Sequence, residues 1–267
     1  MLPTPGPDRA ALITGASSGI GAEIARVLSA RGHHVVLVAR RTDQLNVLAH
    51  QIEGPSSIVG ADLSQPADRA ALPDRVAELG LDVDILVNNA GLTTTGPVSA
   101  ADPRAELNVV EVDVAAVVDL CTRFVGAMAS RRRGAVLNVA SLGAFGPLPG
   151  QAVYGAAKGF VLSYTYALRE ELKPSGVTAT TLCPGPVKTG FGAAAGISDE
   201  DAEAALPKPL WVSAEDVAKA AVDGLAAGKP VVVPGRLNHA ATAVYQLTPK
   251  RLLLPLLARS HPSLKKK

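Results

Sequence analysis

Tyr154 and Lys158 are two side chains whose types and spacing suit acid–base chemistry. They lie in a stretch with helical periodicity, where a separation of four positions places both side chains on one face. A free tyrosine, with a pKa of about 10, exchanges protons poorly near neutrality, but an adjacent ammonium favours the phenolate. The pair therefore suits proton transfer at an oxygen atom. The motif alone is weak, because it can arise by chance and Tyr154 could merely cap a core.

A hydroxyl group upstream of this pair strengthens the interpretation. Ser141 lies 13 residues before Tyr154 and follows the apolar run 134–140, which is typical of a strand. At the carboxyl end of that strand, its hydroxyl could hydrogen-bond a substrate carbonyl oxygen as negative charge develops there. Ser141, Tyr154 and Lys158 are thus a candidate catalytic set.

The segment 11–21 predicts a phosphate-binding turn between a strand and a helix. Its first glycine permits a tight exit from the strand, its second lets the backbone approach a pyrophosphate, and its third lets the helix lie close to the sheet. The helix N-terminus offers free amides and a partial positive charge to phosphate, and two serines add hydroxyl donors. The alternative is an ordinary glycine-rich turn. The residues assigned to this site are Gly15, Ser17, Ser18, Gly19, Ile20 and Gly21.

Arg40 and Arg41 follow the second predicted strand, at the place where an acidic residue would hold the ribose hydroxyls of NAD. A carboxylate would repel a 2′-phosphate, whereas a guanidinium pairs with it through charge-assisted hydrogen bonds. The sequence therefore favours NADP(H) over NAD(H). The alternative is a pair of solvated arginines at the start of a helix, with the cofactor selected elsewhere.

Short apolar runs that alternate with longer helical patterns predict βαβ units. Most strand candidates are unbroken apolar runs, which indicates a parallel sheet covered by helices on both faces. We therefore expect a single-domain α/β Rossmann fold, with a doubly wound, seven-stranded parallel sheet. The expected strands are 10–14, 34–39, 57–60, 84–88, 134–140, 176–182 and 230–233, and the expected helices are 19–31, 42–52, 65–79, 102–130, 151–172 and 213–227.

The composition excludes several classes of protein. With 48% hydrophobic residues and a net charge of +2, the chain is too apolar for a disordered protein and too neutral for a nucleic-acid binder recruited by charge. Its apolar runs are too short to span a bilayer and residues 1–9 lack a secretory core, so we expect a cytoplasmic location. Neither the five histidines nor Cys121 and Cys183 have metal-ligand spacing, so we expect no metal site and two buried free thiols.

These separated elements together resemble the short-chain dehydrogenase/reductase family over residues 8–235. The family implies hydride transfer between the nicotinamide C4 of the cofactor and a carbonyl carbon, with the tyrosine handling the proton and Lys158 also binding the nicotinamide ribose. It further implies a homodimer or homotetramer. Residues that match its other cofactor motifs are Asp62 and Leu63 near the adenine, Asn89, Ala90 and Gly91 after the fourth strand, and Pro184, Val187 and Thr189 around the nicotinamide carboxamide.

One position departs from the family pattern. Asp113 stands in the stretch 111–114, where the family usually has an asparagine that helps hold a water linked to the lysine. If the main-chain carbonyl holds that water, Asp113 can serve in the same relay. If the side-chain amide matters, the added carboxylate would pair with Lys158 and alter the pKa of Tyr154.

The substrate is expected to be a small carbonyl compound or alcohol. Leu142, Phe145, Leu148 and Phe191 would line an apolar crevice without a charged anchor, which favours a hydrophobic ketone, aldehyde or alcohol. The segment 190–212 is interpreted as a substrate lid, with a plain surface insertion as the alternative. A weakly catalytic dinucleotide sensor is the competing function. A third possible function is that of a nucleotide-sugar epimerase or dehydratase. It is less favoured, because such enzymes usually have a longer C-terminal substrate region than this sequence provides.

The C-terminal extension 236–267 ends in a basic segment punctuated by prolines. Its apolar run is far too short to span a bilayer, so we expect it to pack on the body. A neighbouring subunit or a membrane surface is the alternative partner.

Overall fold

Seven parallel strands form the centre of the protein, which a computed structural model describes for residues 2–192, 207–260 and 264. The strand order is β3-β2-β1-β4-β5-β6-β7, so the direction of winding reverses between β1 and β4. The doubly wound Rossmann-type sheet expected from the sequence is confirmed. The strands are β1 (Arg9–Thr14), β2 (His34–Ala39), β3 (Ser56–Gly60), β4 (Asp82–Asn88), β5 (Ala135–Val139), β6 (Thr178–Leu182) and β7 (Val231–Val232).

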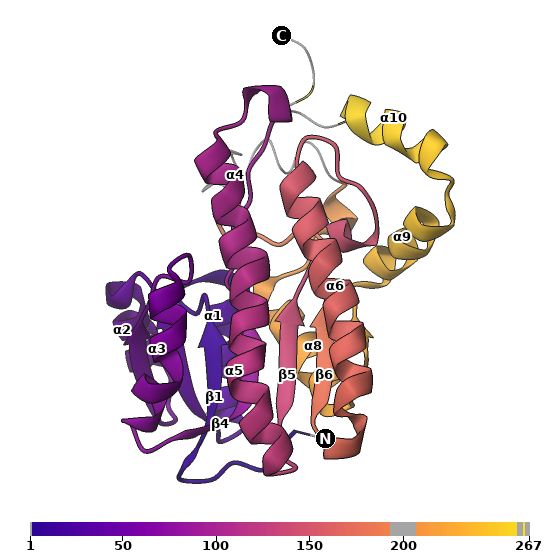
Figure 1. Cartoon of the computed structure of the whole chain (residues 1–267). Helices are drawn as coiled ribbons and strands as arrows, with labels where there is room; N and C mark the ends of the chain where they lie inside the picture. Colours follow the sequence, from indigo (N-terminus) through magenta and orange to yellow (C-terminus); the bar gives the residue numbers. More distant parts are fainter. Residues whose placement is uncertain (1, 193–206, 261–263, 265–267) are drawn as a thin grey trace.

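Helices cover both faces of the sheet (Figure 1). On one face lie α1 (Gly19–Ala30), α2 (Thr42–Gln51) and α8 (Ala214–Ala226), whose buried side chains share a core with one side of the strands. On the other face lie α3 (Pro66–Ala77), α5 (Ala116–Ser130) and α6 (Ala152–Leu172). The central strands carry apolar side chains on both faces, and each face packs against helices. Those strands are therefore continuous hydrophobic runs in the sequence.

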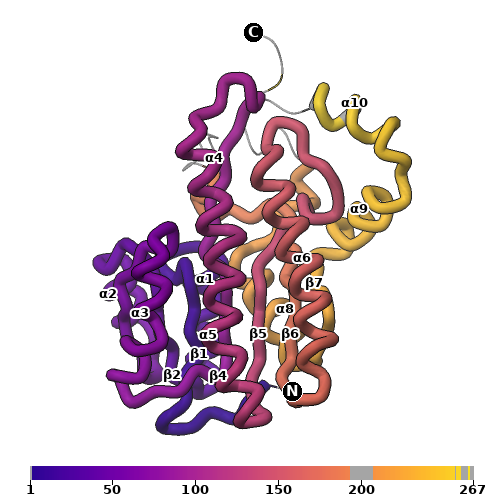
Figure 2. Tube along the Cα trace, viewed as in Figure 1, coloured from indigo at the N-terminus to yellow at the C-terminus, as the bar shows by residue number. Residues whose placement is uncertain are grey.

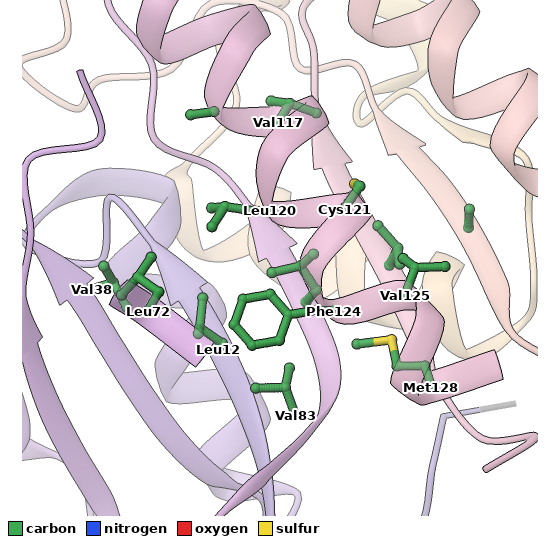
Figure 3. Packing of buried hydrophobic residues seen from close by; sticks show 14 of the residues in the cluster. Leu12, Val38, Leu72, Val83, Val117, Leu120, Cys121, Phe124, Val125 and Met128 are labelled. Atoms are coloured by element: carbon green, nitrogen blue, oxygen red, sulfur yellow. The ribbon is translucent and has the colours of Figure 1, made fainter. Parts of the chain in front are cut away.

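The core on the second face is built around α5. Figure 3 shows Leu120 and Phe124 of α5 directed toward Leu12 of β1 and Val83 of β4. These side chains recur at helical spacing, so one face of α5 is buried while the opposite face meets solvent. Tight packing of this kind fixes the position of α5 on the sheet. It therefore also fixes the start of α5 and residues 111–115, which precede it.

A chain of buried polar groups crosses this core. The Asn88 side-chain amide donates a hydrogen bond of 2.8 Å to the Asn138 carbonyl oxygen, and the Asn138 amide donates one of 2.9 Å to the Thr165 hydroxyl. These bonds join β4, β5 and α6. Because a buried amide without a partner is costly, the bonds also fix the register of the two strands that lead into the site.

The long helix expected at 102–130 is divided into three parts. It consists of α4 (Pro103–Val110), the π-helical segment η2 (Glu111–Ala115) and α5. The Asp102 carboxylate caps α4 by accepting a hydrogen bond from the Arg104 amide, which explains where the helix begins. A π-helical turn widens a helix locally and changes where its side chains point, and this one contains Asp113.

The C-terminal extension forms two helices that the sequence did not lead us to expect, α9 (Arg236–Leu247) and α10 (Lys250–Ser260). The tube in Figure 2 shows the chain leaving the sheet after β7, passing through α9 beside the body and continuing into α10 away from the strands. None of the helices in the described ranges is long and apolar enough to cross a membrane. Most of the expected lid at 190–212 lies outside the described residues, because 193–206 are not among them.

Candidate functional site

A cavity of about 1170 Å³ opens at the carboxyl ends of the strands, beside the point where the winding reverses. In doubly wound sheets this crevice is the place where ligands bind, because the two neighbouring crossover connections diverge there. Its walls come from the glycine-rich turn after β1, the loops after β2 to β6, and the first turns of α6. It is large enough for a dinucleotide together with a small substrate.

The glycine-rich turn approaches its neighbours too closely for side chains. A Cβ added to Gly19, which has a φ of +57°, would lie 2.8 Å from the Cβ of Thr189, and one added to Gly21 would lie 2.4 Å from the Asn89 amide nitrogen. Asn89 holds the turn by donating a hydrogen bond of 2.9 Å to the Thr14 carbonyl. The Ser18 side chain leaves the first amides of α1 uncapped. This cradle therefore fits a pyrophosphate.

Arg40 and Arg41 both line the cavity and are exposed there. The Arg41 guanidinium donates hydrogen bonds of 2.9 Å to the hydroxyl oxygens of Ser17 and Ser18, so it extends over the glycine-rich turn. Asp62, by contrast, turns its carboxylate onto the Ser64 amide and hydroxyl. The rim of the cavity after β2 thus presents two cations.

Ser141 and Tyr154 meet on the floor of the cavity. Ser141 follows β5, and its Oγ accepts a hydrogen bond of 3.1 Å from the Gly143 amide, which leaves the hydroxyl proton available for donation. The Ser141 side chain lies near enough to the Tyr154 phenol to lower its pKa, and the ring of Phe191 lies 5.9 Å from the Tyr154 ring. The two hydroxyl groups can therefore contact one substrate oxygen.

Lys158 lies one turn beyond Tyr154 on α6, and its ammonium is almost fully buried. Its Nζ lies 5.7 Å from the centre of the Tyr154 ring and donates a hydrogen bond of 3.1 Å to the Val139 carbonyl. Its charge is matched by Asp113, whose Oδ2 lies 2.9 Å away. The Asp113 side chain is completely buried, and its other oxygen accepts a hydrogen bond of 2.7 Å from the Leu92 amide.

Gly91 makes room for this ion pair. A Cβ at position 91 would lie 3.1 Å from Asp113 Oδ2 and 3.2 Å from Lys158 Nζ. A side chain there would press on both charged groups at once. The carboxylate at position 113 thus pairs with the lysine, and this contact leaves open which group of Asp113 would hold the water of the relay.

Burial and charge act against each other in this cluster. Burial raises the pKa of Tyr154, and the Lys158 ammonium and the Ser141 side chain oppose this only in part, while the Asp113 charge adds to it. Burial alone would lower the pKa of Lys158, but the Asp113 carboxylate reverses that effect, so the pKa of Lys158 is raised. Burial also raises the pKa of Asp113 against the pull of Lys158. The expectation that Lys158 alone makes the phenol acidic is therefore too simple for this site.

Most residues assigned from the sequence line this one cavity. They are Gly15, Ser17, Ser18, Gly19, Ile20, Arg40, Arg41, Asp62, Leu63, Asn89, Ala90, Gly91, Ser141, Tyr154, Lys158, Pro184, Val187 and Thr189. Gly21 and Asp113 lie behind the wall instead, Gly21 against Asn89 and Asp113 against Lys158. The structure thus brings the residue set together, and the roles of its members remain a proposal.

The substrate end of the cavity differs in part from expectation. Leu142, Leu148 and Phe191 line it, but Phe145 does not and packs against the core on the α6 face. Two polar residues that the sequence did not point to, Thr93 and Gln151, also line it and are joined by a hydrogen bond of 2.9 Å. No sequence signal singled them out, because they lie in loops whose path depends on the tertiary structure.

Comparison with known proteins agrees with this geometry. The family model described as short chain dehydrogenase matches residues 9–200. The chain belongs to the short-chain dehydrogenase/reductase family. It is therefore an oxidoreductase of that family, and none of its relatives is needed to establish the fold, which the strand order already shows.

Proteins similar to this short-chain dehydrogenase/reductase include one solved with NADPH and one solved with NAD. It is 34% identical over 235 residues to Nodulation protein G of Rhizobium sp. (strain N33), with 86% of this chain and 94% of the relative covered. A short-chain dehydrogenase from Sphingobium yanoikuyae in complex with NADPH is 30% identical, with a TM-score of 0.78 over 90% of this chain and 96% of that one. A family member from Burkholderia phymatum in complex with NAD is 25% identical, with a TM-score of 0.80 over 96% and 97%.

The buried ion pair predicts a large coupling energy between Lys158 and Asp113. Lys158→Met leaves a buried carboxylate without its cation, so we expect the free energy of unfolding at neutral pH to fall by about 3–5 kcal/mol. Adding Asp113→Asn should restore part of this loss, because the site then holds no net charge. Urea denaturation of the wild type, both single variants and the double variant measures the coupling.

The exposed pair Lys219–Asp223, with a separation of 2.7 Å on α8, is the matched control for this cycle. Its coupling should be below about 1 kcal/mol. Removal of the cation should also raise the pKa of Asp113 further, so the loss in Lys158→Met should shrink as the pH falls and the carboxyl becomes protonated. A buried pair that couples no more strongly than the exposed one would contradict the prediction.

Proposed function

We propose that this short-chain dehydrogenase/reductase interconverts a carbonyl group and an alcohol on a small, largely hydrophobic substrate with NADP(H). The observation that supports this most directly is the convergence of Ser141, Tyr154 and Lys158 on the cavity wall next to the glycine-rich turn. Two hydroxyl groups and a buried cation at one place can bind an oxygen atom and exchange a proton with it. The family membership supplies the reaction class.

The residues divide the chemistry between them. When bound, the nicotinamide cofactor supplies or accepts the hydride at the substrate carbon. Tyr154 gives its phenolic proton to the substrate oxygen during reduction and takes it back during oxidation, while the Ser141 hydroxyl stabilises the charge that develops on that oxygen. The Lys158 ammonium stabilises the phenolate form of Tyr154. Lys158 in turn is oriented by Asp113 and by the Val139 carbonyl.

The preference for NADP(H) rests on the two arginines at the end of β2. Both face the cavity, and no acidic residue follows that strand where the ribose would lie. Arg41 is positioned by Ser17 and Ser18, so little side-chain freedom is lost when it binds a phosphate. Hydrogen bonds from a guanidinium to a phosphate are among the strongest in proteins.

The residues that line the substrate end of the cavity favour a largely apolar substrate with a neutral polar group. Leu142, Leu148 and Phe191 contribute carbon surface, and Thr93 with Gln151 offers one neutral polar position. No charged side chain in the described part of this wall, apart from Lys158, could anchor an ionic substrate. Hydrophobic ketones and secondary alcohols are therefore the preferred test compounds.

Replacement of the proposed acid tests the reaction directly. In Tyr154→Phe we expect NADPH oxidation with a panel of hydrophobic ketones to fall by about 10²–10⁴-fold, because the substrate oxygen no longer receives a proton. NADPH binding, followed by fluorescence, should change little. Tyr166→Phe, at an exposed position on the same helix, is the control and should keep full activity. Tight NADPH binding without turnover in the wild type would instead favour a sensor.

Cofactor selection is tested by removing the two guanidinium groups. In Arg40→Ala/Arg41→Ala we expect the KM for NADPH to rise at least about tenfold, since charge-assisted hydrogen bonds contribute about 1.5–3 kcal/mol each. The KM for NADH should change far less. Arg26→Ala, on the exposed side of α1, controls for the loss of surface charge. An equal loss for both cofactors would place the selection elsewhere.

The carboxylate of Asp113 should set the pH dependence of turnover. The Asp113 charge raises the pKa of Tyr154, so Asp113→Asn should lower that pKa. Alcohol oxidation needs the phenolate, so the rising limb of its pH profile should move to lower pH in Asp113→Asn. Glu111→Gln, which removes a carboxylate that faces Arg69 from the same π-helical segment, is the control. Superimposable pH profiles for wild type and Asp113→Asn would exclude this role.

A further inference from the structure

The C-terminal helices expose a row of aliphatic side chains. On α9, Leu237, Val244 and Leu247 are 52%, 63% and 83% exposed. Their spacing of seven and three residues places them on one face of the helix. Leu252, near the start of α10, is 64% exposed. We refer to these four residues, with the basic residues of α9 and α10, as the α9–α10 surface.

The orientation of α9 is fixed by contacts on its other side. Asn238 is buried and donates hydrogen bonds to the carbonyls of Leu210 and Pro234 at 3.0 and 2.9 Å. The Tyr245 hydroxyl donates a hydrogen bond of 2.6 Å to the Pro147 carbonyl. An amphipathic helix of a soluble domain normally buries its apolar stripe, but α9 directs polar groups inward and its aliphatic row outward. Within the described part of the chain, nothing covers that row.

The charge of this region is strongly one-sided. Residues 224–267 contain eight lysines and arginines and no aspartate or glutamate, so the preceding 223 residues carry a net charge of −6 within a total of +2. Three of the eight cations lie in the last three positions of the sequence. The basic residues are Lys229, Arg236, Lys250, Arg251, Arg259, Lys265, Lys266 and Lys267. A partner for this region must therefore be both apolar and anionic.

The α9–α10 surface lies next to the cavity. Leu257 of α10 lines the cavity together with Phe191 and Leu210. In Figure 1, α9 and α10 stand beyond the carboxyl ends of the strands. Anything that covers these helices is thus close to the entrance used by an apolar substrate.

We propose that the α9–α10 surface docks this protein onto an anionic lipid bilayer, with both helices lying in the headgroup region. Helices that combine exposed aliphatic residues with lysine and arginine bind at this depth, because the apolar side chains leave water while the cations meet lipid phosphates. A second copy of the chain is a poorer occupant, since face-to-face pairing would bring two basic surfaces together. A nucleic acid would match the charge but not the aliphatic row.

Vesicle sedimentation of the full chain tests the proposal. We expect at least about tenfold stronger binding to phosphatidylcholine vesicles with about 30% phosphatidylglycerol than to phosphatidylcholine alone, and a loss of most binding at about 1 M salt. Compared with the wild type, Val244→Glu/Leu247→Glu should bind the anionic vesicles at least about ten times more weakly, because two side chains that enter the bilayer become charged. Lys250→Gln/Arg251→Gln should weaken binding to the anionic vesicles alone.

Val47→Glu is the matched control, since Val47 on α2 is 54% exposed and lies far from α9 along the sheet. Its vesicle binding should equal that of the wild type. Circular dichroism should show the same thermal unfolding for every variant, because all the altered side chains are exposed. Sedimentation does not measure turnover, so this test succeeds or fails separately from the proposed reaction.

Three results would overturn the proposal. The first is no binding of the wild type to the anionic vesicles. The second is equal binding by wild type and Val244→Glu/Leu247→Glu. The third is a concentration-dependent dimer, seen by sedimentation velocity without lipid, that the same two substitutions dissociate, which would make this face an interface between copies of the chain.

Discussion

The site depends on one requirement, namely that the buried ammonium of Lys158 must have partners. An unpaired charge in a protein interior is very costly, so a lysine can lie beneath the cavity only if an opposite charge and hydrogen-bond acceptors are already in place. Asp113 supplies the charge and the Val139 carbonyl an acceptor. The two come from different elements, the π-helical segment and β5, so the lysine ties α6 to both.

The same requirement limits what the lysine can do for Tyr154. A carboxylate 2.9 Å from Nζ cancels part of the positive field at the phenol, and burial of the phenol favours its neutral form. Both effects favour the protonated phenol, which is the form that the proposed reduction of a carbonyl requires. An asparagine at position 113 would bind the Lys158 ammonium less strongly. It would not, however, cancel any of the positive field of that ammonium at the Tyr154 phenol. In the proposed reaction, Asp113 would therefore weaken the stabilisation of the phenolate by Lys158 while it holds the ammonium in place.

The fold was predictable because its signals are local. Continuous apolar runs marked every strand end to within two residues, and the glycine pattern at 15–21 marked the turn between β1 and α1. The convergence of Ser141, Tyr154 and Lys158 followed from strand and helix geometry in the same way. Thr93 and Gln151 had no such signal, since loop residues reach the cavity only through the tertiary path of the chain. The pairing of Asp113 with Lys158 remained open for a related reason, because it depends on the π-helical turn and on the space above Gly91.

The helices of the C-terminal extension were missed for a different reason. Periodicity in a sequence shows that a helix has an apolar face, but it assigns that face to the core by default. In α9 the inward face is instead held by Asn238 and Tyr245, whose hydrogen bonds to carbonyls leave no periodic trace. The aliphatic row then faces outward, in a region without a single carboxylate side chain. A chain whose acidic and basic residues are separated in this way has a small net charge and yet a strong local field, so a composition near neutrality excludes neither a charged docking surface nor its partner.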